Sequence, residues 1–340
     1  MIPNFLPLLF YFSFESLVLF GDKIYEFKIN FFMLFTTLTT IFFLITSPFL
    51  NQVAFWGSLI ENNNSLPDIS YSLGPKLTAK SALIIDFDSG DILFEKDSTK
   101  ILPIASITKL MTALVFLDKN DRQWDERVVV LEKDLVEWSN SGGEEIRPAR
   151  LNIGVGDELN IKDVFYSGLI KSANNASKIL SRLIPNCCGQ TFSDLMNQKA
   201  KFLGMTNTYF TEPTGLSPAN CSNARDLSKL VKAAFNQEKI RTALSYQDYD
   251  IKIKRNGFFY NQRLYNTDKL LDSFINLKGA KTGYLEESGY CLAGVSDYLN
   301  RKLIVIILGA ETDEGRFQEA KSLIWWTAQQ EQLKKEVDVL

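Results

Sequence analysis

The sequence contains no histidine among its 340 residues. This absence excludes a Ser-His-Asp triad, a His-Glu-x-x-His zinc site and any imidazole general base. Acid–base chemistry in this chain must therefore use lysine, carboxylate or tyrosine side chains.

A strong charge of either sign is also missing. The chain has 37 basic and 40 acidic residues, a net charge of -3 and no basic run. A surface that binds nucleic acid normally appears as a basic patch or stripe. We therefore expect no nucleic-acid partner.

Cysteine is scarce, and its four residues show no paired Cys-x-x-Cys spacing, so the sequence predicts neither a metal site nor a cofactor. Adjacent Cys187 and Cys188 would form only a strained bridge with each other. Buried free thiols are the favoured interpretation, and a bridge from one of the two to Cys221 stays open. The fourth cysteine is Cys291.

Charged side chains are absent from residues 31–60, where Phe31 to Ile45 is almost wholly apolar and threonine. A helix of about 20 such residues crosses a bilayer. Lys23 and Lys28 precede this stretch, and the positive-inside bias then places the following chain outside the cytoplasm. A retained anchor is favoured over a cleaved signal peptide that would release a secreted protein.

Three regions follow from this pattern. Residues 1–60 are expected to be an N-terminal membrane anchor or signal region. Residues 61–76, with three consecutive asparagines, Pro67 and Pro75, have the composition of a linker. Residues 77–340 are expected to fold as an extracytoplasmic domain on the periplasmic or cell-wall face.

The domain alternates strand-like and helical patterns. Short apolar runs around Asp88-Ser89-Gly90 predict a β-hairpin. Strands at both ends with helices between them predict an α+β fold in which one sheet is assembled from distant parts of the chain, with a helical insertion. The expected strands are 82–87, 91–95, 250–254, 277–281, 290–295 and 303–308. The first expected helix starts just before Ser106 and runs to about Phe116, and the other expected helical stretches are 161–183, 192–203, 224–235 and 317–333.

Ser106 and Lys109 lie three residues apart at the start of the first apolar helix. This spacing places two side chains on one helix face, within reach of a hydrogen bond. A buried lysine is costly to keep charged, so a neutral Lys109 would be a base for Ser106. A Ser-x-x-Lys pattern by itself more often marks an ordinary helix start, and the interpretation needs further motifs.

Two further motifs follow in the chain. Ser172-Ala173-Asn174 offers a hydroxyl and an amide between two helical pieces. Lys281-Thr282-Gly283, expected at the end of a strand, offers an ammonium, a hydroxyl and a residue that allows a substrate backbone to approach. The order Ser-x-x-Lys, Ser-x-Asn, Lys-Thr-Gly is that of serine β-lactamases and penicillin-binding proteins.

With these motifs the chain resembles the D-alanyl-D-alanine carboxypeptidase family of low-molecular-mass penicillin-binding proteins. Asn175 and Leu285 depart from the aspartate and threonine that many relatives carry. The resemblance implies a β-lactamase/transpeptidase-like fold, with helices on the faces of an antiparallel sheet. It spans roughly 80–326 and is carried by the stretches Ile104–Ala113, Leu169–Ala176, Met196–Asn197, Leu203–Met205, Thr214–Leu216, Ala224–Leu227 and Lys281–Tyr284.

The resemblance also implies roles. Ser106 would attack the penultimate D-alanine carbonyl of a peptidoglycan stem peptide, and water would hydrolyse the acyl-enzyme. β-Lactams would inhibit by acylating the same serine. Lys109 would be the base, Ser172 would relay a proton, and Asn174 would orient Lys109 and the substrate. Lys281 and Thr282 would bind the substrate carboxylate, and Gly283 would let the substrate approach closely. The backbone amides of Ser106 and Tyr284 would form the oxyanion hole.

Alternatives stay open on the same residues. A D-alanyl endopeptidase that cuts cross-links would use the same site, and the chain ends soon after Trp325 and Trp326, without the second β domain of many carboxypeptidases. A class A β-lactamase is disfavoured because no Glu-x-x-Leu-Asn follows Asn174. A non-hydrolytic penicillin-binding wall sensor is the alternative from another functional class.

Overall fold

The computed structural model describes residues 74–136, 139–141, 144–146, 148–185, 189–298 and 301–337. The expected anchor or signal region and nearly all of the expected linker lie outside the described residues, as do Cys187 and Cys188. Cys221 and Cys291 are free thiols, so the bridge to Cys221 that the sequence left open is not formed. No helix among the described residues is both long and apolar enough to cross a bilayer.

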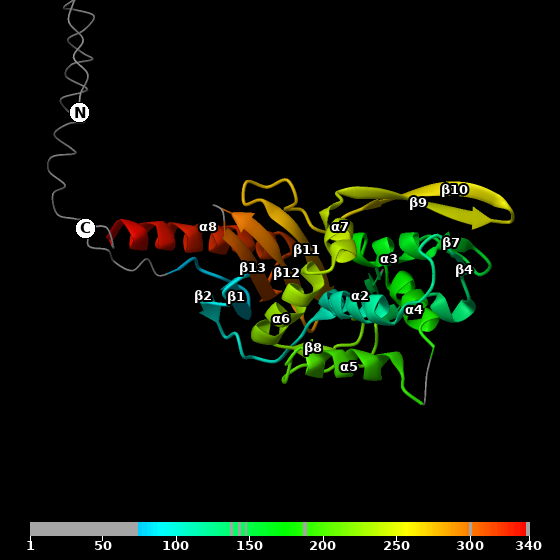
Figure 1. Cartoon of the computed structure of the whole chain (residues 1–340), viewed down its shortest axis with the longest axis horizontal. Helices are drawn as coiled ribbons and strands as arrows, with labels where there is room; N and C mark the ends of the chain where they lie inside the picture. Colours follow the sequence, from blue (N-terminus) through cyan, green and yellow to red (C-terminus); the bar gives the residue numbers. More distant parts are fainter. Residues whose placement is uncertain are drawn as a thin grey trace, which may run out of the picture. The chain divides into compact units, whose positions relative to one another are not determined.

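One antiparallel sheet joins strands from both ends of the folded part, as predicted (Figure 1). Its order is β11-β12-β13-β1-β2, so β11 lies at one edge. The predicted hairpin is β1 and β2. The bounds are β1 (Ser81–Asp86), β2 (Ile92–Lys96), β11 (Leu277–Leu285), β12 (Gly289–Tyr298) and β13 (Arg301–Ala310).

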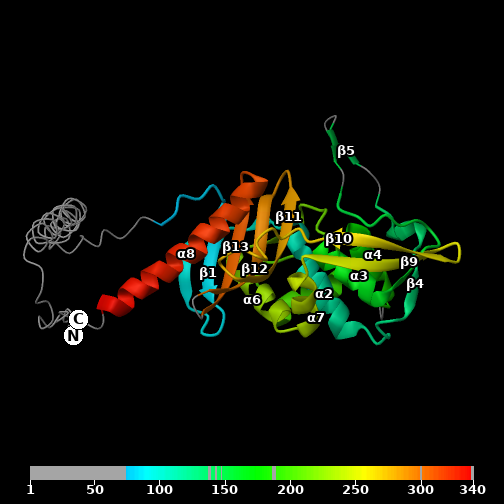
Figure 2. The same cartoon turned by 90° about the horizontal axis from the view of Figure 1, so that it is seen from above.

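The continuous apolar run of β13 reflects burial on both faces of this sheet. Successive side chains of a strand point to opposite faces. Ile304 and Ile306 therefore join the core among the helices, and Val305 and Ile307 join a second core. The long helix α8 (Asp313–Val337) closes that second core, and Figure 2 shows it crossing the strands.

Six further helices of the described residues pack around the first core, and those predicted at 192–203 and 224–235 have side-chain N-caps. The Thr191 hydroxyl accepts from Asp194 N at 3.2 Å, and the Asn223 side chain accepts from Asp226 N at 2.8 Å. Such caps satisfy free N–H groups of the first turn. The helices are α2 (Thr108–Lys119), α3 (Ile161–Ile170), α4 (Asn174–Leu183), α5 (Phe192–Phe202), α6 (Ala224–Phe235) and α7 (Glu238–Ser245).

The stretch 161–183 is divided at the second motif, which lies between two helical pieces as expected. Ser172 has a φ of 60°, and this left-handed conformation interrupts helical hydrogen bonding. One feature of the helical part differs from the sequence prediction, because helix α7 was not predicted. Its buried side chains are only Ile240, Ala243 and Leu244, which is a weak apolar pattern.

The expectation of one sheet was wrong for residues 250–254, which belong to a second sheet of order β10-β9-β7-β4. The missed signal is Asn256-Gly257, where both residues have positive φ, the conformation of a tight hairpin turn. Two short pairs, β3 with β8 and β5 with β6, complete the strands. The bounds are β3 (Leu102–Pro103), β4 (Arg127–Val129), β5 (Ser139–Ser141), β6 (Glu144–Ile146), β7 (Glu158–Asn160), β8 (Cys221–Ser222), β9 (Asp248–Arg255) and β10 (Phe258–Tyr265).

Candidate active site

Ser106 lies on a single 3₁₀ turn, η1 (Ala105–Ile107), between β3 and α2. The sequence predicted a helix that starts just before Ser106, whereas the α-helix begins at Thr108. Ala105 has a φ of 46°, and a β-carbon on Gly215 would lie 2.1 Å from the Ala105 carbonyl oxygen. Close packing of the loop that contains Gly215 therefore holds Ala105, the residue before Ser106, in its strained left-handed conformation.

Lys109 lies in the first turn of α2 and meets three oxygen atoms. Its Nζ is 2.7 Å from Ser106 Oγ and 2.7 Å from Asn174 Oδ1, and it also donates to the Thr214 carbonyl. The side chain is only 1% exposed. The Ser106–Lys109 contact predicted from spacing is thus confirmed, and the Lys109–Asn174 contact joins the first motif to the second.

Burial is the main cause that lowers the pKa of Lys109 to about 7, and the negative charge of Glu212 acts in the opposite direction. Burial, and not the charge of Lys281, accounts for the lowered pKa of Lys109. Lys281 itself is fully buried, and its pKa lies well below the usual value because of burial and the nearby charges of Lys109 and Arg316. A substantial fraction of Lys109 is therefore neutral near pH 7.

The second motif occupies the break between α3 and α4. Asn174 N donates to Ala149 O at 2.8 Å, which fixes the start of α4 and aims the side-chain amide at Lys109. Ser172 is 5% exposed. Within the described residues no hydrogen bond joins its hydroxyl to Lys109 or Lys281, so the two polar residues of this motif differ in their contacts.

The third motif lies inside β11, not at its end as predicted, because the strand continues to Leu285. Lys281 Nζ donates to Thr282 O at 3.0 Å. The Thr282 hydroxyl donates to the Thr267 hydroxyl at 2.7 Å. The strand pairs with β12 on one side only, and its other side borders η1 and Ser106.

Gly283 and Tyr284 continue β11 beside the Ser106 turn. A β-carbon on Gly283 would lie 2.8 Å from Ser106 N, so the strand reaches Ser106 only because this residue has no side chain. Tyr284 is 53% exposed, and its ring stacks on Tyr290 with centroids 4.3 Å apart. From α8, Arg316 Nη1 donates to the Gly283 carbonyl at 2.9 Å.

Four residues of this neighbourhood were not identified as functional from sequence. Glu212 and Thr214 lie on the loop 211–220, where Thr214-Gly215-Leu216 was noted only as similar to the family. Arg316 is buried and bound to Gly283 O, and Asp268 is a buried carboxyl whose pKa is raised to about 6 by burial. Single charged residues distant in sequence give no local pattern that would reveal them.

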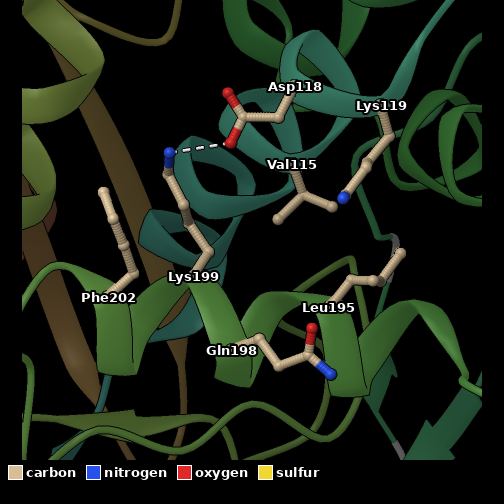
Figure 3. A pocket seen from close by; sticks show the side chains of 7 residues that line it. All are labelled: Val115, Asp118, Lys119, Leu195, Gln198, Lys199 and Phe202. Carbon is tan, nitrogen blue, oxygen red and sulfur yellow. Dashed lines mark ion pairs between the residues drawn. The ribbon is translucent and has the colours of Figure 1, made fainter.

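A hollow between α2 and α5 contains none of the predicted site residues (Figure 3). Lys199 on α5 pairs there with Asp118 on α2 at 2.7 Å. Phe202 at its rim is 81% exposed. This hollow is separate from the residues around Ser106.

The chain matches known proteins over nearly all of the described part. A family model described as D-alanyl-D-alanine carboxypeptidase, peptidase S11, matches residues 70–312. The D-alanyl-D-alanine carboxypeptidase DacF of Bacillus subtilis is 32% identical over 72% of this chain. The chain covers 61% of that protein, which is less than two thirds of its length.

Other relatives carry a different activity in their names. The D-alanyl-D-alanine endopeptidase of Escherichia coli is 33% identical, over 74% of this chain and 78% of that protein. The endopeptidase of Pseudomonas aeruginosa is 32% identical, over 76% of this chain and 80% of that protein. Sequence similarity therefore does not separate the two activities.

Solved structures confirm the predicted fold. The Streptomyces K15 DD-transpeptidase superposes with a TM-score of 0.68 at 23% identity, over 75% of this chain and 98% of that one. Penicillin-binding protein D2 of Listeria monocytogenes, in a cefotaxime-bound form, gives 0.62 at 27% identity, over 75% of this chain and 98% of that one. The family model and the relatives above 30% identity show that this chain belongs to the peptidase S11 family of D-alanyl-D-alanine carboxypeptidases.

Proposed function

We propose that the protein removes the terminal D-alanine from peptidoglycan stem peptides through an acyl-enzyme on Ser106. The observation that supports this most directly is the buried Lys109 amine, 2.7 Å from Ser106 Oγ and with a pKa of about 7. A base works best when its pKa is near the working pH. Lys109 meets that condition without histidine.

In this proposal neutral Lys109 accepts the Ser106 proton as Oγ attacks the carbonyl carbon of the penultimate D-alanine. The C–N bond to the terminal D-alanine then breaks, and the leaving amine takes a proton. Water hydrolyses the ester and regenerates Ser106. Asn174 keeps the Lys109 amine on Ser106 through its 2.7 Å contact, and Ser172 is assigned the relay of the proton to the leaving amine.

The oxyanion of the tetrahedral intermediate would be bound by the backbone N–H groups of Ser106 and Tyr284. The close approach of Gly283 to Ser106 N supports this pairing, because it brings β11 beside η1. Preorganised donors of this kind contribute about 3–4 kcal/mol to barrier lowering. Since the contact uses the main chain, the exposed Tyr284 ring is not required for it.

Lys281 and Thr282 are assigned to the terminal carboxylate of the substrate. Burial and the nearby charge of protonated Lys109 both disfavour the charged form of Lys281, so the pKa of Lys281 is low. An arriving carboxylate would favour its charged form, since an opposite charge nearby raises a lysine pKa. Substrate binding would thus charge Lys281 while Lys109 stays neutral as the base.

A D-alanyl-D-alanine endopeptidase is the second candidate. It is favoured by the two relatives of that name, which match this chain at 32–33% identity over 78–80% of their own length. The bond broken is again an amide after a D-alanine, so the same residues would act. The two activities differ in whether a second stem peptide occupies the leaving-group side.

The nucleophile is tested by incubating purified full-length protein with a fluorescent penicillin. Wild-type protein and a Ser89→Ala control, changed at an exposed hydroxyl in the turn between β1 and β2, should be labelled equally. Ser106→Ala should remain unlabelled. Labelling of Ser106→Ala would reject the assignment. A wall sensor that binds but does not hydrolyse would be labelled without turnover of peptide.

The activity is tested by offering two substrates separately. Free D-alanine released from a pentapeptide identifies a carboxypeptidase. Cleavage of a cross-linked muropeptide dimer into monomers identifies an endopeptidase. Our proposal expects the pentapeptide to be turned over at the higher kcat/KM, and a reversed preference would replace it with the second candidate.

We also propose that residues 31–47 anchor the protein in the cell membrane with the catalytic domain on the extracytoplasmic face. The support is the uncharged stretch itself. Carbonate extraction of membranes, together with protease access in intact spheroplasts, tests it. Recovery of the full-length chain in the soluble fraction would contradict the anchor.

A further inference from the structure

The loop 211–220 is organised by one carboxylate, Glu212. Oε2 accepts hydrogen bonds from Thr214 N and Thr214 Oγ1, both at 2.6 Å. Oε1 accepts from Gly215 N at 2.6 Å, from Asn220 Nδ2 at 3.0 Å and from Ser217 N at 3.3 Å. Five donors on two oxygens indicate an ionised side chain, because a protonated carboxyl would lose acceptor capacity.

This loop touches the reacting residues at two points. The Thr214 carbonyl accepts from Lys109 Nζ, and Gly215 packs against the Ala105 carbonyl next to Ser106. Two bonds fix the loop to α2 on either side: Thr112 Oγ1 donates to Pro213 O at 2.7 Å, and Asn220 Nδ2 donates to Thr108 Oγ1 at 3.2 Å. Any displacement of the loop would therefore displace an acceptor of Lys109.

Glu212 also acts on Lys109 by charge. The groups that face the Lys109 amine are Ser106 Oγ from η1, Asn174 Oδ1 from α4 and Thr214 O from the loop. The charged neighbours are Glu212 from the loop and Lys281 from β11. Glu212 opposes the effect of burial and keeps the Lys109 pKa as high as about 7.

We propose that Glu212 is a positioning residue that holds the Thr214 carbonyl on Lys109 and keeps a negative charge beside the Lys109 amine. This inference rests on the proposed function, in which Lys109 is the base for Ser106. Glu212 does not reach the reacting atoms itself. It sets where the base lies and the pH at which the base becomes neutral.

The test is the pH dependence of Ser106 acylation by a fluorescent penicillin, measured on the full-length protein. Acylation of the wild type should rise as pH increases through the Lys109 pKa. In Glu212→Gln the lost negative charge lowers the pKa of Lys109. The acidic limb of the profile, which is the part where the acylation rate rises with pH, should therefore move about 1 pH unit lower. The rate on the plateau should fall roughly 10-fold. The NH₂ group of glutamine cannot accept hydrogen bonds from the N–H donors of the loop, so the loop and the Thr214 carbonyl would shift.

Two variants separate charge from packing. Glu212→Asp keeps the charge but is shorter, so its acidic limb should stay with wild type while its plateau falls. Asn220→Ala removes a support of the loop and leaves Glu212 in place, so its plateau should fall without a shift of the limb. If circular dichroism shows that Glu212→Gln does not fold, Glu212→Asp provides the test instead. Acylation of Glu212→Asp at the wild-type rate at every pH would overturn the inference.

The two possible failures are distinguishable. An acidic limb of Glu212→Gln that coincides with wild type, while Ser106 is still labelled, overturns only the role of Glu212. Labelling that persists in Ser106→Ala overturns the proposed function itself. A limb shifted to lower pH in Glu212→Gln, and not in Asn220→Ala, supports the inference.

Discussion

Gly283 in β11 and Ser106 in η1 approach so closely that a β-carbon on the glycine would stand 2.8 Å from the serine backbone nitrogen. It would also stand 2.9 Å from Ala105 Cβ. Both neighbours belong to a turn that the surrounding loop already confines. The third motif therefore needs glycine for the packing of two elements, in addition to any approach of substrate.

Gly283→Ala should force β11 and η1 apart. We expect a loss of about 1–3 kcal/mol in the free energy of unfolding, typical of overpacking in a dense interior. Penicillin acylation should fall about 100-fold, because a shift near 1 Å misplaces the reacting groups. Chemical denaturation and acylation kinetics measure the two effects.

Gly154→Ala is the matched control, because nothing lies within 4 Å of its β-carbon position. Both quantities should stay at the wild-type level in this variant. Wild-type acylation by Gly283→Ala would show that η1 tolerates the displacement.

Lys109→Arg should abolish the base while keeping a cation. A guanidinium stays protonated at every working pH, so acylation of Ser106 should drop by about 10²–10⁴, the usual contribution of a general base. Lys119→Arg, at the exposed end of the same helix, should acylate like wild type. Acylation of Lys109→Arg at the wild-type rate would assign the base to another group.

Asn174→Asp places a carboxylate where the amide oxygen now lies 2.7 Å from Lys109 Nζ. The added negative charge should raise the pKa of Lys109 by about 1–3 units. The acidic limb of acylation should then move to higher pH, the opposite direction from Glu212→Gln. Asn152→Asp, on the surface, should leave the limb in place. An unmoved limb in Asn174→Asp would argue that Lys109 does not control it.

The stability of the protein should depend on Lys109 in a predictable direction. The pKa of Lys109 is about 7 in the folded protein and 10.5, its ordinary value, in the unfolded chain, so between these pH values the unfolded chain binds the proton and the folded chain does not. The contribution of Lys109 to the free energy of unfolding therefore rises with pH across this window.

Lys109→Met lacks that contribution. Its stability relative to wild type should be greatest at pH 7 and below, and should decrease by a few kcal/mol towards pH 10.5. Urea denaturation of both proteins at several pH values measures the difference. A difference that is constant with pH would mean that burial does not lower the Lys109 pKa.

Local patterns in the sequence determined much of the fold. The helices predicted at 192–203 and 224–235 begin at the predicted residues, Phe192 and Ala224. The apolar run 303–308 predicted the strand β13. These elements were predictable because periodicity and apolar runs involve residues only a few positions apart. The Asn256-Gly257 turn was equally local and could have revealed β10.

The spacing of Ser106 and Lys109 likewise determined their contact, and the three motifs in order indicated which distant segments meet. Only the tertiary structure decided how they meet. The break at Ser172, the position of the third motif inside β11 and the packing of Gly283 on Ser106 depend on long-range contacts. The low pKa of Lys109 has the same origin, because burial comes from several elements packing together, and so does the influence of Glu212, which no local pattern encodes.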